Sequence, residues 1–295
     1  MTPIITAVVQ AGSVAEDNTA YVPWWSYTKT VLAAASLVLV SQNRLHLDEP
    51  VEGRPFTLRQ LLQHRAGLVD YGPLAAYHKA VTDGETPWPV ADLLQRVGAE
   101  TIAYEPGQGW GYSNVGYLLV RGLVEQTVGA SLDASFKRLV FEPLGIVNAK
   151  VARFPGDLDA TAWGNATRYH PGWVYHGLLI GTASSAALLL HRLLAGALLP
   201  ASLLAAMRTA FPLNVPMSGR PWKSPSYGLG LMCGVGEPPE YYIGHTGGGP
   251  GSTAAVYQAS GEGASGPGRR TVAVFAPLDA ADVVERRAML LAHGG

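Results

Sequence analysis

The sequence predicts an α+β fold, in which strands near both ends of the chain share one sheet and helices fill the middle. Apolar runs with strand character occur early and late, at 3–10, 19–22, 228–235, 241–244, 253–258 and 271–276. Other segments repeat apolar residues at helical spacing, at 57–67, 90–97, 115–128, 132–141, 184–195, 198–209 and 279–293.

The segment 26–41 predicts a helix that is apolar on nearly every side, as the run at 31–35 illustrates. A helix that is hydrophobic all round is buried within a protein. A reactive side chain in its first turn would therefore lie at the edge of the core.

The remaining segments predict turns and loops. The stretch 13–18 is polar, 73–89 is irregular, 152–177 is loop-like and 261–268 has the composition of a Gly/Ser hairpin loop. Aromatic side chains in the third of these stretches either pack the loop or line a pocket; they are Trp163, Tyr169, Trp173 and Tyr175.

Size and charge narrow the class of partner. The 295 residues suit one domain, 1–295, with two lobes. A net charge of −1 argues against nucleic acid and against an anionic membrane, since both require a basic excess, so we expect a small-molecule substrate. The chain length leaves the oligomeric state open.

The same letters suggest a cytoplasmic protein. The first residues lack a basic stretch followed by a long apolar run, and the apolar segment 30–40 is too short to span a bilayer. The single cysteine, Cys233, excludes an intrachain disulfide, and we expect it to be a small residue in a glycine-rich strand.

Ser26 and Lys29 are the first candidates for chemistry. Three residues apart on a helix, they lie on the same face one turn apart. A serine hydroxyl becomes a good nucleophile when a neighbour accepts its proton, and burial lowers the pKa of a lysine enough for this task. The alternative is an N-cap serine at the start of a surface helix, although Lys29 is the only lysine in the first 78 residues.

A second candidate is Tyr112-Ser113-Asn114, which lies between glycines just ahead of a predicted helix. A phenol transfers protons, and a carboxamide orients a substrate or holds a lysine. The alternative is that Ser113 or Asn114 only caps the helix.

The third candidate is the glycine-rich segment 244–251, with His245, Thr246, Gly247 and Gly248. Such glycine density lets backbone N–H groups approach a ligand, as an oxyanion hole requires, although a plain hairpin turn fits equally. No G-x-S-x-G elbow, phosphate loop, dinucleotide fingerprint or metal-ligand spacing is present, so we expect neither a cofactor nor a metal.

The three segments together resemble the S-x-x-K serine hydrolases, which comprise class C β-lactamases, related low-molecular-weight penicillin-binding proteins and β-lactamase-like esterases. The second segment resembles the Y-x-N motif of class C, and 245–247 is similar to the H-T-G form of the esterase-like branch. The sequence between the motifs also resembles the family, at 45–51, 61–68, 105–117, 143–145 and 227–230. The likeness therefore runs from about residue 21 to the last strand.

The resemblance implies an antiparallel sheet flanked by helices, with an α/β lobe from about 1–48 and 178–295 and a mostly helical lobe inserted at about 49–177. It implies that Ser26 is acylated, that Lys29 activates it and that Tyr112 is a general base. Asn114 would orient the substrate, and 245–248 would bind it, with the N–H groups of Ser26 and Gly248 as the oxyanion hole.

Three departures from the family shape the expected function. His245 stands where lysine is common, which removes a permanent cation and lowers the expectation of β-lactamase activity. Pro23-Trp24-Trp25 is bulky, and only 25 residues precede Ser26, so the family's N-terminal helix is expected to be absent or short. We therefore expect a serine hydrolase acting through an acyl-enzyme on a small ester or amide. The alternatives are a β-lactamase, a D-amino-acid peptidase or amidase, an acyltransferase and a catalytically silent binding relative.

Overall fold

The computed structural model describes residues 4–16, 18–165, 167–215, 217–260 and 269–294. The expected 261–268 loop lies outside these residues. An eight-stranded sheet forms the centre, with the order β2-β1-β11-β10-β9-β8-β7-β6 and antiparallel pairing throughout. Its strands are β1 Ile5–Gln10, β2 Ser13–Glu16, β6 Phe211–Pro212, β7 Ser224–Tyr227, β8 Met232–Val235, β9 Tyr241–Gly249, β10 Ser252–Ala259 and β11 Arg270–Ala276.

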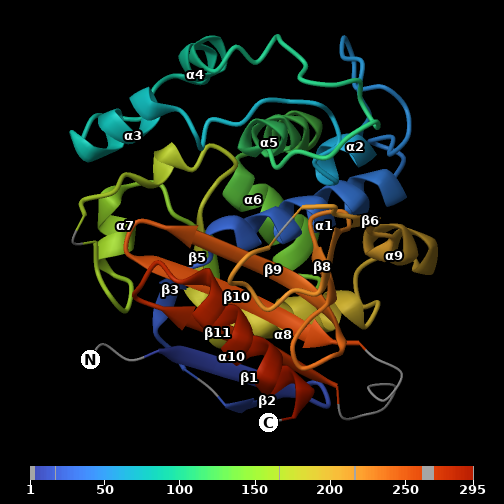
Figure 1. The fold of residues 1–295 in the computed structure, drawn as a ribbon, viewed down its shortest axis with the longest axis vertical. Helices are drawn as coiled ribbons and strands as arrows, with labels where there is room; N and C mark the ends of the chain where they lie inside the picture. The colour runs from blue at the N-terminus through green and yellow to red at the C-terminus, as the bar shows by residue number, and fades with distance from the viewer. Residues whose placement is uncertain (1–3, 17, 166, 216, 261–268, 295) are drawn as a thin grey trace.

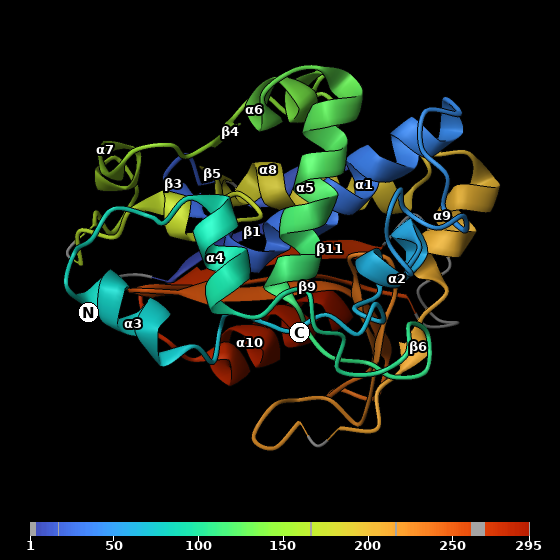
Figure 2. The same ribbon diagram turned by 90° about the horizontal axis from the view of Figure 1, so that it is seen from above.

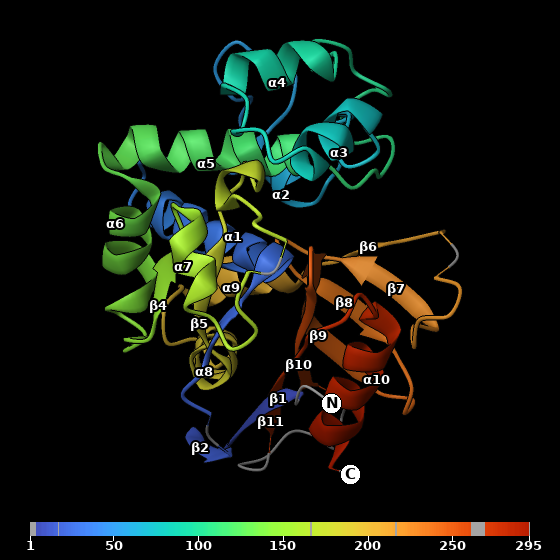
Figure 3. The same cartoon turned by 90° about the vertical axis from the view of Figure 1, so that its left-hand side faces the viewer.

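The two ends of the chain meet in this sheet, because β1 pairs with β11 over six residue pairs, from Ile5↔Phe275 to Gln10↔Arg270. Helix α10, Ala281–His293, covers one face, and helix α8, Ala183–Leu194, covers the other (Figure 3). The α+β prediction, with an antiparallel sheet flanked by helices, is confirmed.

A smaller three-stranded sheet lies beside the main one, in the order β3-β5-β4. Its strands are β3 Tyr21–Pro23, β5 Leu179–Thr182 and β4 Ala149–Val151. The predicted strand at 19–22 therefore pairs with β5, and β4 and β5 were not predicted. Strands this short show too few alternations of apolar and polar residues to be recognised.

The other helices gather over one end of the sheet. Figures 1 and 2 show α5 between α4 and α2, and Figure 1 shows α1 beneath it. Their bounds are α1 Thr28–Ser41, α2 Leu58–Leu62, α3 Ala75–Thr82, α4 Val90–Arg96, α5 Asn114–Val128, α6 Leu132–Phe136, α7 Pro155–Asp159 and α9 Ala201–Arg208, with short 3₁₀ or π turns at η1 Trp25–Tyr27, η2 Lys137–Phe141 and η3 Pro171–Trp173.

Several predicted segments differ from the structure. The strand predicted at 228–235 is confined to β8, since residues 228–231 form no strand. The helix at 57–67 is confined to α2, because the backbone at His64 takes a positive φ of 58°. The irregular stretch 73–89 contains α3, which buries only Ala80 and so lacks an apolar stripe. The polar stretch 13–18 contains the edge strand β2, and 152–177 contains α7 and η3.

Helix α1 is buried, as its composition predicts. Its side chains from 28 to 39 are buried, and the helix packs against α5, α6 and η2. Cys233 is a buried free thiol in β8. Within the described part of the chain, no helix is long and apolar enough to cross a membrane.

Helix α1 bears Lys29 and also contributes many side chains to the hydrophobic core, including the fully buried Leu32. We therefore expect Leu32→Ala to reduce the free energy of unfolding by about 2–5 kcal/mol through lost burial and a residual cavity. The control Leu290→Ala, at a position 51% exposed on α10, should change it by about 0.5 kcal/mol or less. Urea denaturation measures both. Equal losses in the two variants would contradict the central place given to α1.

Candidate active site

Ser26 lies in the η1 turn, immediately before helix α1 begins. The predicted helix start at Ser26 is therefore two residues early, although the one-turn spacing to Lys29 is kept. Trp25, directly before it, has a φ of +44°, in the left-handed region that a bulky residue rarely adopts. Its indole Nε1 donates to Ser252 Oγ at 2.9 Å on β10, which anchors this strained residue to the sheet. The turn therefore projects Ser26 Oγ from a fixed backbone.

The Lys29 amine points at Ser26, with 3.1 Å between Nζ and Oγ. Nζ also donates to Asn114 Oδ1 at 2.8 Å and lies 3.2 Å from Nε2 of His176. The Lys29 side chain has no exposed surface, and this burial lowers its pKa to about 7, while the carboxylate of Asp70 acts in the opposite direction. A neutral amine is thus available beside the hydroxyl near neutral pH.

Tyr112 approaches Ser26 from the other side, with its Oη 3.0 Å from Oγ. Burial raises the pKa of the Tyr112 phenol above its ordinary value, so the phenol is protonated near neutral pH. Its ring stacks on His64, whose Nδ1 accepts the Ser113 backbone N–H at 3.0 Å. His64 therefore packs at the end of α2 and supports the phenol.

The sequence left open whether Ser113 and Asn114 cap a helix or take part in the site, and the structure gives each residue one of these positions. Ser113 caps α5, since its Oγ accepts the Gly116 N–H at 3.0 Å. Asn114 is the first residue of α5, and its side chain reaches Lys29 instead. Asp70 fixes Asn114 by accepting its backbone N–H at 2.8 Å. The first turn of α5 is thus capped by Ser113, and it directs the Asn114 side chain at the Lys29 amine.

The glycine-rich segment is the second half of β9. Strand β8 pairs with β9 only as far as Gly244, whereas β10 pairs with it up to Gly249. Within the described residues, the β8-side edge of 245–249 is therefore unpaired. A Cβ on Gly247 would clash with the Ser26 backbone nitrogen, and one on Gly249 would clash with the Trp25 ring. Only glycine permits this close approach of strand and turn.

His245 and Thr246 point to opposite faces of β9, as neighbours on a strand do. The carbonyl of Thr246 accepts from His245 Nδ1 at 2.7 Å, so the other ring nitrogen, Nε2, accepts from Tyr227 Oη at 2.8 Å. Burial, assisted by the charge of Lys29, lowers the pKa of His245 to about 3, and the ring is fully buried. Direct substrate contact by His245 stays a prediction, because its ring lines neither cavity described below.

Two cavities meet at Ser26. One, of about 230 Å³, has aromatic walls that include Tyr169 and Trp173, so the pocket interpretation holds for these two. Of the other predicted loop aromatics, Tyr175 packs on Tyr71, and Trp163 packs against the core and also lines another cavity, of about 380 Å³. The second cavity, of about 410 Å³, is mostly apolar; its lining includes Ser26, Trp110, Tyr112, Leu213, Arg220, Thr246, Gly247 and Gly248.

Sequence reasoning missed three polar residues here: Asp70, His176 and Arg220. Asp70 and His176 act on Lys29 from separate loops, and Arg220 lines the larger cavity. His176 is followed by Gly177 at the end of the loop-like stretch 152–177, just before the buried strand β5. This position beside a glycine was the one feature of the sequence that could have marked His176 as a site residue. Among the described residues, no cluster of His, Cys, Asp or Glu could hold a metal ion.

The family model described as "Beta-lactamase" matches residues 7–291. The chain belongs to the β-lactamase family. This confirms the resemblance to S-x-x-K serine hydrolases, a family that includes esterase and D-aminopeptidase relatives.

Curated relatives match over part of their length. Penicillin-binding protein 4* of Bacillus subtilis is 30% identical over 159 residues, covering 49% of this chain and 34% of that protein. Esterase EstB of Burkholderia gladioli is 31% identical over 154 residues, covering 44% of this chain and 39% of that protein. The matched regions thus span less than half of these relatives.

Solved structures match over nearly the whole chain. A D-stereospecific amidohydrolase from Streptomyces sp. has a TM-score of 0.77 at 22% identity, covering 99% of this chain and 94% of that one. The octameric penicillin-binding protein homologue from Pyrococcus abyssi has a TM-score of 0.78 at 20% identity, covering 99% and 73%. At this identity the likeness establishes the fold.

Proposed function

We propose that the chain is a serine hydrolase that acts through an acyl-enzyme on a small ester or amide. The observation that carries this proposal is the convergence on Ser26 Oγ of the Lys29 amine at 3.1 Å and the Tyr112 phenol at 3.0 Å. A silent binding relative would have no need to bury a lysine amine, because removing an amine from water destabilises a fold.

The protonation states suggest how the roles of base and acid are divided between Lys29 and Tyr112. With a pKa of about 7, the neutral Lys29 amine accepts the Ser26 proton as Oγ attacks the carbonyl carbon. The Tyr112 phenol, still protonated, donates to the leaving oxygen or nitrogen as its bond to carbon breaks. The proton held by Lys29 then passes to the phenolate, which restores both groups. Water then attacks the acyl-enzyme, gives up its proton to the same pair, and Ser26 departs as a hydroxyl.

The oxyanion of the tetrahedral intermediate needs donors that are fixed in advance. We assign this role to the backbone N–H groups of Ser26 and Gly248. Both residues line the two cavities, and the unpaired edge of β9 beside Ser26 supports the assignment. Thr246 and Gly247 line the larger cavity and would position the substrate, with Asn114 holding the amine.

An amide of a D-amino acid with an aromatic side chain is the second candidate. The 230 Å³ cavity beside Ser26 is lined by aromatic rings that include Tyr77, Tyr169 and Trp173. D-aminopeptidases of Brucella are among the relatives, at about 30% identity over about a third of the chain. Turnover of D-phenylalanine 4-nitroanilide, compared with 4-nitrophenyl butyrate, distinguishes this candidate from a simple esterase.

Ser26→Ala should abolish covalent labelling by a fluorophosphonate and reduce ester turnover by about a thousandfold or more, because no acyl-enzyme can form. Intact-mass spectrometry and 4-nitrophenyl ester hydrolysis measure the two effects. Ser41→Ala, an exposed serine at the far end of the same helix, is the control and should keep full activity. Absence of any Ser26-dependent adduct on the unchanged protein would contradict the proposal.

The pH dependence tests Lys29. Since its pKa is about 7 and the neutral amine is the base, kcat/KM should rise with pH through about 7. The Asp70 carboxylate favours the protonated amine, so Asp70→Asn should shift this limb to lower pH while still accepting the Asn114 N–H.

Asp83→Asn, which alters an exposed ion pair with Lys79 on α3, is the matched control and should leave the pH profile unchanged. A profile that instead falls as pH rises through 7 would mean that the ammonium form is required, and the base would then be Tyr112.

A further inference from the structure

Arg220 brings a permanent cation into the larger cavity. It lies in the connection between β6 and β7, and its side chain is 26% exposed. Among the described residues that line this cavity of about 410 Å³, it is the one charged side chain; the rest are apolar, aromatic or hydroxyl-bearing, or glycine. The charge also reaches the catalytic group, since Arg220 lowers the pKa of Tyr112, against the larger effect of burial.

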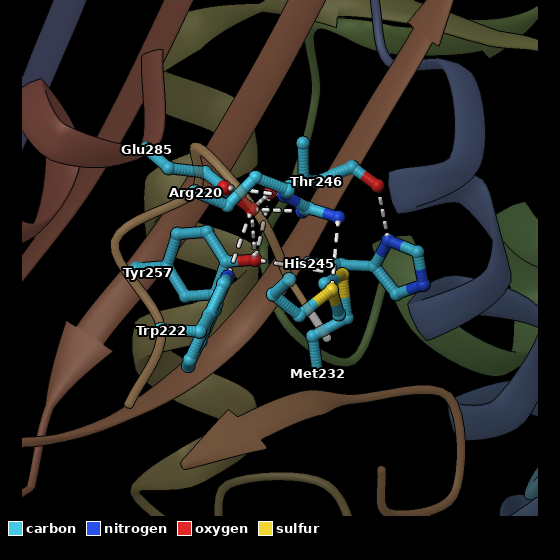
Figure 4. Close-up of polar contacts among 8 residues, drawn as sticks. Arg220, Trp222, Met232, His245, Thr246, Tyr257 and Glu285 are labelled. Atoms are coloured by element: carbon cyan, nitrogen blue, oxygen red, sulfur yellow. Dashed lines mark hydrogen bonds and ion pairs between the residues drawn. The ribbon is translucent and has the colours of Figure 1, made fainter. Parts of the chain in front are cut away.

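A buried carboxylate holds the guanidinium in place. Glu285, on α10, is fully buried and accepts from Arg220 through both oxygens, at 2.8 Å from Nε and closely from Nη2. Thr246 Oγ1 and Trp222 Nε1 donate to the same carboxylate, as Figure 4 shows. A bidentate pair with these extra donors fixes both the position and the orientation of the arginine.

This arrangement leaves one arm of the guanidinium available. Nε and Nη2 are used by Glu285, whereas Nη1 has only the sulfur of Met217, at 3.8 Å, among the described partners. Sulfur is a weak acceptor, so the two Nη1 hydrogens retain most of their capacity to donate. Glu285 is fully buried and shared among several donors, whereas Met217, the neighbour of Nη1, itself lines the cavity.

We propose that Arg220 binds an acidic group of the substrate in this cavity, so that the enzyme prefers esters or amides that carry a carboxylate away from the scissile carbonyl. This rests on the proposed function of Ser26. It also revises the conclusion drawn from His245, since the cavity holds a permanent cation after all, contributed from a different segment of the chain. In an apolar cavity, a charge-assisted hydrogen bond discriminates strongly between an acid and its neutral ester.

The test compares each acid with its own methyl ester. The pairs are 4-nitrophenyl hydrogen adipate with methyl 4-nitrophenyl adipate, and 3-acetoxybenzoic acid with methyl 3-acetoxybenzoate. The first pair carries the acid on the acyl side and the second on the leaving-group side, so together they cover both orientations. The protein should hydrolyse the acid of at least one pair with a kcat/KM about tenfold higher than that of its methyl ester.

Arg220→Met should bring this ratio close to one, mainly through a higher KM for the acid. Arg286→Met is the matched control, because Arg286 is an exposed arginine of α10 that contacts Glu237 and Gly219. It should leave the ratio unchanged. Since the Arg220 variant leaves Glu285 unpaired and could unfold, the salt dependence of the unchanged protein gives a second readout: added NaCl should lower the rate for the acid more than for the methyl ester.

The proposal is overturned if neither acid is preferred by the unchanged protein, or if Arg220→Met slows the acid and its methyl ester by the same factor. The latter would identify the Arg220–Glu285 pair as structural only. A failure of the proposed function looks different, because no Ser26-dependent hydrolysis would then occur. If the protein hydrolyses both members of a pair and Ser26→Ala loses this activity, the proposed function holds and only the role of Arg220 is in question.

Discussion

The burial of one amine is the constraint on which this site depends. Lys29 has no exposed surface, and its amine is enclosed by groups from α5, from the turn at Ser26 and from the loop before β5. An ammonium ion removed from water is costly, and that cost is what lowers the pKa of Lys29 to about 7. The apolar composition of α1 and the closure of α5 over it maintain this state. The histidines around the amine are neutral as well. His64, His176 and His245 each have a lowered pKa, chiefly through burial.

Two residues with strained backbone conformations bring the remaining groups to this amine. Trp25 and His64 both adopt positive φ values, at +44° and +58°, which cost of order 1–2 kcal/mol each. The first turns the chain so that Ser26 precedes the buried helix, and the second brings the His64 ring beneath Tyr112. Neither residue is a glycine, so side-chain contacts must over-determine each conformation: the indole bond to Ser252 for Trp25, and the Ser113 N–H bond with ring stacking for His64.

The sequence predicts the parts of this site that have local rules, and misses the parts that depend on tertiary contact. The three-residue spacing of Ser26 and Lys29 needs only helical geometry, and the glycines of β9 are visible in the letters. The partners of Lys29 have no such rule, since Asp70 and His176 are 106 residues apart and meet only because α5 and β5 pack on α1. The same limit explains β4 and β5: their pairing with β3 is long-range, and three or four residues carry too little periodicity to reveal it.

The placement of charge around β9 follows from the same constraint. A permanent cation at His245 would lie on the face of β9 that is turned toward Lys29, and would disfavour the protonated amine that the proposed acylation step requires. The ring there is neutral, and Figure 4 shows it directed away from Glu285. The permanent cation instead lies on the opposite side of the strand, at Arg220, where Glu285 compensates it. Alternation along one strand thereby directs the neutral His245 ring toward Lys29, while Thr246, on the other face, contacts the carboxylate that compensates Arg220. The base and the acid-binding group that we propose are thus served by opposite faces of β9.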